Sequence, residues 1–287
     1  MKTILITGAG GFIGNNLFNF LKKKKNINLF GTINKLKNKN TKSNKNTIKK
    51  NFTKKNFFKI DLSNLNKIKN LISIINPDII YHFAAMADHS YGEKNKRLCK
   101  KYNSKITKNI IKCINKDSKL IFLSSDKVYS SNPKISPENI NLKPNSYLAK
   151  EKIICEKIIK KKIKKYFILR LPIVHKMGEY FKFSTIDNFL YLLKKKQNIR
   201  VFNNVKRSFL KISELNVFLE KLIDSKNYGI YNVGSKKLSY SQRVKMLSAE
   251  LKINCKNKIN EIQGNVFPLE QNFNTNKVKK KFKCIFT

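Results

Sequence analysis

Short apolar runs alternate with longer amphipathic segments over the first 171 residues of the chain. The apolar runs predict strands at 4–6, 28–32, 57–60, 79–83, 120–124 and 166–171. Apolar residues at helical spacing predict helices near 12–21, 64–75, 98–115 and 149–164. This alternation predicts an α/β fold with a doubly wound parallel sheet.

The alternation becomes looser beyond Pro172. Helices are predicted near 185–196, 213–224 and 240–252, with one short strand near 230–233. We therefore expect two domains, one over 1–171 and a smaller C-terminal substrate-binding lobe over 172–287, whose short strand returns to the sheet. Residues 34–56 form a stretch rich in Lys, Asn and Thr, which predicts a solvated loop.

The sequence TGAGGFIG occupies residues 7–14, directly behind the first apolar run and ahead of the first predicted helix. An ordinary strand-turn-helix connection would also tolerate glycine here. However, glycines three residues apart at this place permit a tight turn, let backbone N–H groups approach a pyrophosphate, and let the helix pack closely on the sheet. We therefore predict a Rossmann-type NAD(P)-binding domain, whose cofactor contacts include Gly8, Gly11, Phe12, Ile13 and Gly14.

The formal net charge of +45 suggests a polyanionic partner, but its distribution argues against one. Only five of the 62 basic residues are arginine, and the lysines are spread over the whole chain. We therefore expect no specific nucleic-acid partner. No apolar run is long enough to span a membrane. The five scattered cysteines and three histidines lack metal-site spacing, which predicts a cytoplasmic protein with reduced thiols and no metal.

The residues after the second predicted strand bear on the choice of cofactor. In a dinucleotide fold, an acid about 20 residues past the glycines binds the adenosine ribose of NAD. Here that place holds 32–35, Thr-Ile-Asn-Lys, and the chain has fifteen lysines but no acid before Asp61. We therefore favour NADP over NAD as the cofactor. Asp61 and Leu62 are candidate adenine contacts, although Asp61 or Ser63 would equally serve as a helix N-cap.

Several further short sequence motifs follow the glycine motif. Together with it they span about four fifths of the chain. Their order and spacing resemble the extended short-chain dehydrogenase/reductase family, which comprises sugar-nucleotide epimerases, dehydratases and reductases. The motifs are Asp61-Leu62-Ser63, PDIIYHFAA at 77–85, Asn103, FLSSDKVYS at 122–130, SPENINLKPNSYLAKEKIICEKI at 136–158, ILRLP at 168–172, RSFLKISEL at 207–215 and IYNVGS at 230–235.

The resemblance implies hydride transfer between a nicotinamide cofactor and a carbon of a nucleotide-activated sugar, coupled to proton transfer at the sugar oxygen. It also implies a homodimer that pairs through the helices near 98–115 and 149–164. In this family Ala84 and Ala85 would line the cofactor ribose and nicotinamide, and Asn103 would lie in the helix beneath the active site. Ser125 would be the hydroxyl donor, and Arg207 would contact the substrate pyrophosphate.

The tyrosine-lysine pair departs from the family pattern of Tyr followed four residues later by Lys. Tyr147 is followed at that spacing by Glu151, with Lys150 and Lys152 on either side. In one reading Tyr147 transfers the proton and Lys150 or Lys152 lowers its pKa. In the other, Leu148 occupies the tyrosine position and Lys152 the lysine position, which would leave an enzyme without its phenol or one in which a local bulge re-aims Tyr147.

The pair Asp126-Lys127 resembles dehydratases that form a 4-keto-6-deoxy sugar, in which the acid protonates the departing hydroxyl. Reductases of 4-keto sugars also carry an Asp there, and 287 residues is close to their length. We therefore predict an NAD(P)-dependent reductase or epimerase of a nucleotide-activated sugar, serving surface polysaccharide synthesis. A 4,6-dehydratase and a catalytically weak nucleotide-binding protein are the alternatives.

Overall fold

The computed structural model describes residues 1–34, 56–129, 137–177, 184–265, 269–271 and 274–287. The predicted loop at 34–56 therefore lies, except for its two end residues, outside the described residues. Two compact units divide the chain. The first comprises 1–124, 146–168 and 219–229, and the second comprises 125–145, 169–218 and 230–287.

The described residues contain a seven-stranded sheet of Rossmann type, in the order β11-β6-β5-β4-β1-β2-β3. The neighbouring pairs β1–β2, β1–β4, β2–β3 and β4–β5 are parallel, as the alternation of strands and helices predicted. The strands are β1 (Lys2–Thr7), β2 (Ile27–Ile33), β3 (Phe57–Lys59), β4 (Ile79–His82), β5 (Lys119–Ser125), β6 (Tyr166–Leu171) and β11 (Gly229–Asn232).

The strand order reverses at β1. The chain runs outward from β1 through β2 to β3 and then returns to β4 on the other side of β1. Thr7 and His82, the last residues of β1 and β4, are paired in register. In an open α/β sheet a ligand binds outside the carboxyl ends of the strands at such a reversal. This edge therefore positions the candidate site.

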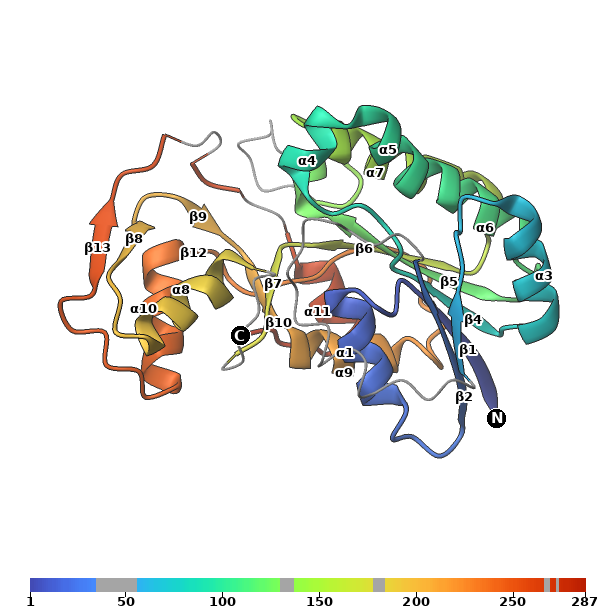
Figure 1. Ribbon diagram of the computed structural model, residues 1–287, viewed down its shortest axis with the longest axis horizontal. Coiled ribbons are helices and arrows are strands. Elements are labelled where there is room, and N and C mark those ends of the chain that lie inside the picture. Colours follow the sequence, from blue (N-terminus) through green and yellow to red (C-terminus); the bar gives the residue numbers. More distant parts are fainter. Residues whose placement is uncertain (35–55, 130–136, 178–183, 266–268, 272–273) are drawn as a thin grey trace. The chain divides into compact units, whose positions relative to one another are not determined.

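Helices cover both faces of the sheet. Figure 1 shows α1 (Phe12–Leu21) on the face opposite to α3 (Leu65–Ile75), α6 (Ile106–Cys113) and α7 (Tyr147–Lys162). The sheet between them is a dry core, because Ile4, Leu5 and Ile6 are at most 1% exposed.

The single helix predicted near 98–115 is wrong in detail. The structure has two short helices, α4 (His89–Lys94) and α5 (Lys96–Lys100), then a π-helical segment, η2 (Lys101–Lys105), which leads into α6. Asn103 lies at the centre of η2 and Thr107 just beyond it. Their side chains donate to the carbonyl oxygens of Cys99 and Asn103, both at 2.9 Å. Apolar periodicity cannot register one extra residue per turn, and such π-bulges are frequent at functional sites.

The second unit has its own apolar core, in which α8 packs against α10. Helix α9 (Ile212–Lys221) runs from this unit into the first. Within the described residues, three small sheets pair β7 with β10, β8 with β13 and β9 with β12, whose bounds follow. The remaining elements are η3 (Asp126–Tyr129), β7 (Ile173–His175), α8 (Thr185–Lys194), β8 (Ile199–Phe202), β9 (Lys206–Arg207), β10 (Phe209–Lys211), β12 (Leu238–Ser239), α10 (Tyr240–Glu250), β13 (Ile259–Ile262) and α11 (Asn276–Phe282).

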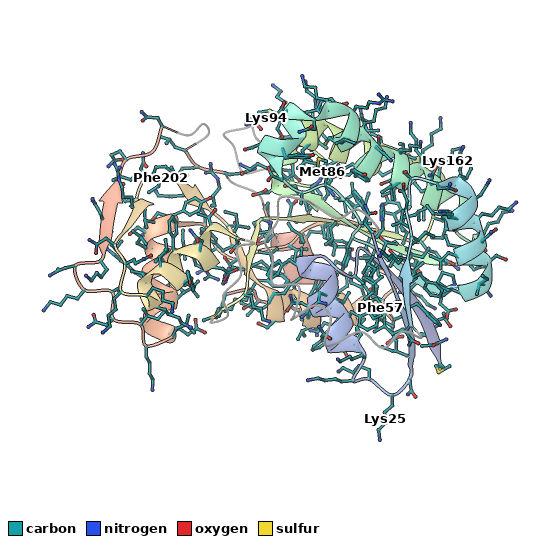
Figure 2. All side chains as sticks on the ribbon, viewed as in Figure 1. Lys25, Phe57, Met86, Lys94, Lys162 and Phe202 are labelled. Carbon is teal, nitrogen blue, oxygen red and sulfur yellow. The ribbon has the colours of Figure 1, made fainter. Side chains whose placement is uncertain are left out.

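The lysines mostly serve as a solvated coat over these elements. Lys25, Lys94 and Lys162 are exposed and point away from the fold (Figure 2). Buried lysines are therefore informative, and Lys119 and Lys152 are both buried with Nζ hydrogen-bonded to backbone carbonyl groups.

Candidate active site

The glycine motif forms a cradle whose walls are backbone. Gly8 has φ +71°, a left-handed conformation that favours glycine, and an added Cβ would lie 2.7 Å from the backbone nitrogen of Ala84. A Cβ on Gly14 would overlap the carbonyl oxygen of Gly8. The turn after β1, the start of α1 and the segment after β4 thus approach more closely than any side chain allows.

The cradle faces the start of α1. Gly11 is the N-cap residue, makes no side-chain cap hydrogen bond, and no acid stands in the first turn. The positive end of the helix dipole at Phe12 and Ile13 is therefore not neutralised by a carboxylate of its own helix. These residues fit the pyrophosphate of a dinucleotide, and Gly8, Gly11 and the start of α1 would hold it.

The end of β2 carries no acid. Thr32 is buried, and its Oγ1 accepts a hydrogen bond from the backbone nitrogen of Gly8 at 3.3 Å. Ile33 lies against the cradle, since a Cβ on Gly10 would be 3.1 Å from its Cγ2. Asn34 follows and is exposed, whereas Lys35 lies outside the described residues.

Asp61 follows β3 and turns the chain. Its Oδ1 accepts from the backbone nitrogen of Ser63 at 2.9 Å, and its Oδ2 lies 3.7 Å from Nζ of Lys101. Burial raises the pKa of Asp61, but the Ser63 hydrogen bonds and Lys101 outweigh it, so the pKa is lowered. Leu62 is buried. The N-cap alternative for Asp61 or Ser63 is wrong, because Asn64 caps α3.

Of the candidate residues after β4, Ala84 lies against the glycine cradle. The backbone nitrogen of Ala84 donates to Oγ1 of Thr7 at 3.2 Å, and Ala85 is exposed. Asn103 is 2% exposed in η2, and its Oδ1 has no hydrogen-bond partner. Ala84 is therefore fixed against the glycine motif, whereas the amide oxygen of Asn103 has unused capacity to accept a hydrogen bond.

The residues of the displaced tyrosine-lysine pair point in different directions from α7. Tyr147 is half-buried, Leu148 is buried and Lys150 is exposed. Lys152 is buried, and its Nζ donates to the carbonyl oxygen of Leu123 at 2.8 Å. The structure ties Lys152 to β5, and which lysine partners Tyr147 stays a prediction.

Two charged side chains act on Tyr147: the Glu151 carboxylate, and the Lys96 ammonium, which lies 5.9 Å from the centre of its ring. Burial raises the pKa of Tyr147, and the Glu151 carboxylate raises it further by charge and by hydrogen bonding. Without a cofactor the net effect on this pKa is therefore a rise, and the expectation that a lysine lowers it stays a prediction. The i, i+4 spacing of Tyr147 and Glu151 was the available signal.

Ser125 and Asp126 belong to the second unit, where Ser125 is the last residue of β5 and Asp126 the first residue of η3. The Ser125 hydroxyl donates to Oδ1 of Asp126 at 3.2 Å and accepts from the backbone nitrogen of Lys127 at 3.2 Å. Burial raises the pKa of Asp126, although Lys127, Ser125 and Arg207 oppose it. Burial also lowers the pKa of Lys127. This segment therefore holds the Ser125 hydroxyl, an Asp126 carboxyl with a raised pKa, and a Lys127 ammonium with a lowered pKa.

Arg207 is only 3% exposed, and backbone carbonyl groups already use part of its guanidinium. Its Nη1 donates to the carbonyl oxygens of Lys206 at 2.7 Å and Leu269 at 2.9 Å. Tyr240 and Asp126 also interact electrostatically with it. Contact of Arg207 with a substrate pyrophosphate remains a prediction.

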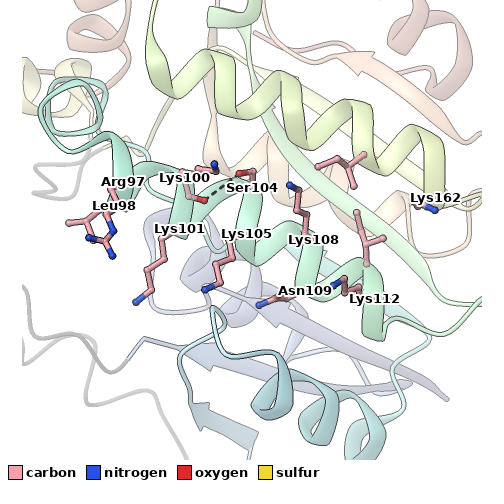
Figure 3. Close-up of a pocket in the computed structure, with 12 residues that line it drawn as sticks. Arg97, Leu98, Lys100, Lys101, Ser104, Lys105, Lys108, Asn109, Lys112 and Lys162 are labelled. Carbon is pink, nitrogen blue, oxygen red and sulfur yellow. Dashed lines mark hydrogen bonds between the residues drawn. The ribbon is translucent and has the colours of Figure 1, made fainter.

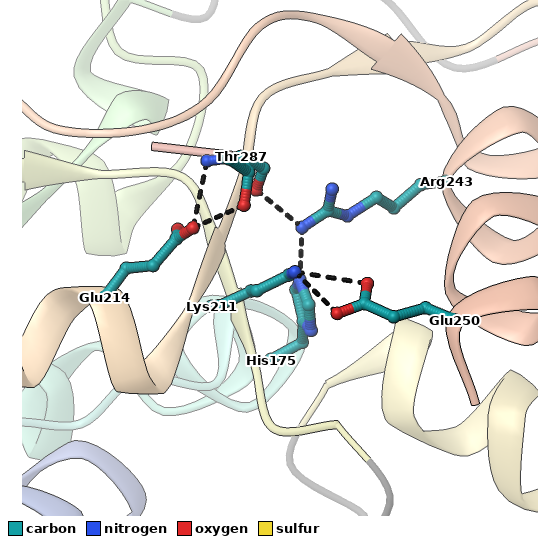
Figure 4. A network of polar contacts seen from close by, with 6 residues as sticks. All are labelled: His175, Lys211, Glu214, Arg243, Glu250 and Thr287. Carbon is teal, nitrogen blue, oxygen red and sulfur yellow. Dashed lines mark hydrogen bonds and ion pairs between the residues drawn. The ribbon is translucent and has the colours of Figure 1, made fainter. Parts of the chain in front are cut away.

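A buried network in the second unit had no signal in the sequence (Figure 4). Nη2 of Arg243 donates to Nε2 of His175 at 2.8 Å and to the carbonyl oxygen of Thr287 at 3.0 Å. The backbone nitrogen of Thr287 donates to Glu214 at 3.0 Å. Burial, with Arg243 and Lys211, lowers the pKa of His175 to about 3. The network joins β7, α9 and α10 to the last residue of the chain.

A cationic groove crosses the outer face of α5, η2 and α6 in the first unit (Figure 3). Its volume is about 1100 Å³, and no acid lines it. We call it the lysine groove. The lysines that line it are Lys100, Lys101, Lys105, Lys108, Lys112 and Lys162.

The part of the chain that the structure describes offers neither a metal site nor a membrane span. No group of three His, Cys, Asp or Glu side chains there is arranged to hold a metal ion. Within the same residues, no helix has the length and apolar character needed to cross a membrane.

Comparisons with known proteins agree on the kind of protein. The model of the NAD dependent epimerase/dehydratase family matches residues 4–234. An uncharacterized protein of Methanocaldococcus jannaschii is 28% identical over 255 residues, which are 82% of this chain and 76% of that protein.

Solved structures share the fold at low identity. A dTDP-4-dehydrorhamnose reductase from Bacillus anthracis in complex with NADP has a TM-score of 0.80 at 22% identity, covering 99% of this chain and 93% of that one. A UDP-glucose 4-epimerase from Thermotoga maritima with UDP-glucose has 0.81 at 19%, covering 99% and 94%. A dTDP-glucose 4,6-dehydratase from Bacillus anthracis with NAD has 0.79 at 18%, covering 100% and 92%. Since the family match covers most of the chain and the glycine cradle fits a dinucleotide, the chain belongs to the NAD dependent epimerase/dehydratase family.

Proposed function

We propose that the protein is an NAD(P)-dependent reductase or epimerase of a nucleotide-activated sugar. The observation that carries the proposal is the backbone-walled cradle, in which Gly8 meets Ala84 beside the start of α1. When bound there, the nicotinamide would exchange a hydride with a sugar carbon. The end of β2 supports NADP as the favoured cofactor, because Asn34 stands where an NAD-binding fold carries an acid.

Tyr147 supports the reductive direction of this chemistry. Burial and Glu151 raise its pKa, so the phenol holds its proton. A protonated phenol suits a general acid, which gives its proton to a carbonyl oxygen as the carbon is reduced. We propose this role for Tyr147, and we propose for the Ser125 hydroxyl a role as hydrogen-bond donor to the substrate.

One observation favours the 4,6-dehydratase as a second candidate function. Burial raises the pKa of Asp126, which favours the protonated acid that elimination of a hydroxyl group needs. The Leu148 side chain, which is buried and has no phenol, keeps the weak nucleotide-binding protein as a third.

Assays on the full chain with nucleotide-linked hexoses separate these functions. A reductase consumes NADPH only when a nucleotide-linked keto sugar is supplied. An epimerase converts one hexose into another with no net use of cofactor, and a dehydratase gives a product lighter by one water without added reductant. In a reductase or epimerase Asp126→Asn should leave part of the turnover, whereas it should stop elimination. Water loss by the wild type would overturn the preferred function.

We also propose a cytoplasmic homodimer that pairs through α6 and α7. Ile111, Ile154 and Ile158 on these helices remain partly exposed. The lysine groove on the same face would repel its copy, so pairing should strengthen as salt screens the charge. Light scattering that gives only monomer at high salt would count against the dimer.

A further inference from the structure

A continuous chain of buried hydrogen bonds crosses the first unit beneath the cradle. Oγ1 of Thr7 and Nδ1 of His82 are 3.0 Å apart, and Nε2 of His82 and Oγ1 of Thr107 are 2.9 Å apart. The Thr107 hydroxyl then donates to the carbonyl oxygen of Asn103 at 2.9 Å. Thr7, His82 and Thr107 are each 1% exposed, so water cannot replace a hydrogen-bond partner that one of them loses.

These hydrogen bonds are all satisfied when each proton is donated in the direction from Thr7 through His82 to Thr107 and Asn103. The Thr107 hydroxyl has one proton, and its acceptors are the Asn103 carbonyl and, at 3.3 Å, Sγ of Cys155. It must therefore accept from His82, which puts the ring proton on Nε2. Nδ1 of His82 then accepts the proton of Thr7. The oxygen of Thr7 in turn accepts from the backbone nitrogens of Phe83 at 3.1 Å and Ala84 at 3.2 Å.

The surroundings keep the imidazole neutral, as this pattern requires. Burial lowers the pKa of His82 to about 3, and the Lys152 ammonium contributes. The ring packs against Phe122, with centroids 5.5 Å apart. No nearby carboxylate acts on this pKa in the described residues. A neutral ring with one donor and one acceptor can join two hydroxyl groups, which an imidazolium with two donors cannot do in this arrangement.

One end of this series of hydrogen bonds lies at the glycine cradle, and the other lies in η2. One end fixes the backbone of Ala84, which closes the cradle against Gly8. The other end fixes the turn of η2 that carries Asn103, whose side-chain oxygen is buried with no partner. Loss of the His82–Thr7 bond should therefore move the cradle wall, and loss of the His82–Thr107 bond should move the turn that carries Asn103.

We propose that His82 is a positioning residue. Its Nδ1 fixes the cradle wall through Thr7, and its Nε2 fixes the turn that carries Asn103 through Thr107, so that the two effects can be lost independently. The inference rests on the proposed function for the identity of the ligand. Its two arms predict different defects: loss of the Nδ1 bond should weaken cofactor binding, whereas loss of the Nε2 bond should lower turnover at unchanged cofactor affinity.

Isosteric variants of the two threonines test the arms separately. Thr7→Val removes the Nδ1 arm and should weaken NADPH binding, measured by calorimetry, by about tenfold, the factor that one lost hydrogen bond supplies. Thr107→Val removes the Nε2 arm and should lower kcat by about tenfold while the dissociation constant stays within about twofold. Thr7→Ser and Thr107→Ser keep the hydroxyls and should restore both values.

Histidine replacements and NMR supply readouts that do not depend on the two threonines. An Asn amide reaches the position of Nδ1 and a Gln amide that of Nε2, so His82→Asn should spare affinity and His82→Gln should spare kcat. The ¹⁵N spectrum of wild-type protein without cofactor should show a neutral Nε2–H imidazole between about pH 5 and pH 8. An imidazolium or an Nδ1–H tautomer would overturn the inference, and so would equal losses of affinity and kcat in both valine variants. Failure of the wild type to bind NAD(H) or NADP(H) would instead overturn the proposed function, because the NMR result does not need a cofactor.

Discussion

Lys152 donates a hydrogen bond from Nζ to the carbonyl oxygen of Leu123 at 2.8 Å. Its ammonium also lies 4.7 Å from the centre of the Phe122 ring. Burial lowers the pKa of this lysine, which Cys155 and Glu156 partly offset. Lys152 thus fastens α7 to β5.

Replacement of the two lysines should therefore separate structure from chemistry. Lys152→Met keeps the aliphatic stem but loses a hydrogen bond from a charged donor, which should lower the free energy of unfolding by about 1.5–3 kcal/mol. Lys150→Met removes an exposed ammonium and should change it by no more than about 0.5 kcal/mol. Urea denaturation measures both. If Lys150→Met lost turnover at full stability, the reading in which Lys150 partners Tyr147 would be favoured.

Acid should destabilise the fold through two buried imidazoles. The pKa values of His82 and His175 are lowered from 6.5 to about 3, so between these limits the unfolded chain binds more protons than the folded chain. Stability should therefore be full above about pH 6.5 and fall as the pH drops below it. Urea midpoints at pH 7 and pH 5 check this. His82→Gln should make the fall shallower by about one proton, and an unchanged slope would contradict the lowered pKa.

The glycine cradle predicts a sharp contrast between two glycines. Gly11→Val should abolish dinucleotide binding, because the side chain would occupy the space that the pyrophosphate needs. Gly92→Ala is the matched control, since its Cβ would meet only side-chain atoms at 3.5 Å or more. Calorimetry of the wild type should give tighter binding of NADP(H) than of NAD(H), and a clear preference for NAD(H) would contradict the reading of the β2 end.

The sheet could be predicted because its strands are short runs of apolar residues that need no partner to be recognised. The pairs β7–β10, β8–β13 and β9–β12 were missed, because strands of two to four residues are defined by partners distant in sequence. Helix α4 was missed for a similar reason, as it is a six-residue helix that Asp88 caps. The Gly8 to Gly14 motif was informative because its geometry is local.

The catalytic candidates were harder to predict, because their chemistry depends on neighbours that folding brings close. The sequence shows that Lys152 follows Tyr147 by five residues. It does not show that the Lys152 ammonium binds the carbonyl oxygen of Leu123. It contains His82 within a family motif, but the bonds to Thr7 and Thr107 join three separate elements. Burial of Asp126, which raises its pKa, likewise cannot be read from η3 alone.

The lysine groove should concentrate the salt-sensitive, sequence-independent nucleic-acid binding that the net charge predicts. Lys105, Lys108 and Lys112 are exposed in it, and Lys22, Lys23 and Lys25 are equally exposed outside it. Changing each set to Gln removes the same charge. If the groove binds, its variant should lose more affinity for an oligonucleotide and lower the salt slope by about 0.9 per lost phosphate contact. Equal losses would show that only net charge matters, and discrimination between sequences at physiological salt would contradict the expectation of no specific partner.

Tyr147 distinguishes an enzyme from a binding protein. If its phenol is the proton donor, Tyr147→Phe should lower kcat by about 10² to 10⁴ and leave cofactor affinity nearly unchanged. Glu151→Gln should lower the pKa of the phenol, because it removes the charge that raises it, and so move the alkaline limb of the rate profile to lower pH. Leu148→Tyr should not help, since Leu148 is 3% exposed and a larger ring would overpack its site. A silent Tyr147→Phe together with a gain from Leu148→Tyr would mean that Leu148 occupies the catalytic position and that the wild type is a weak enzyme.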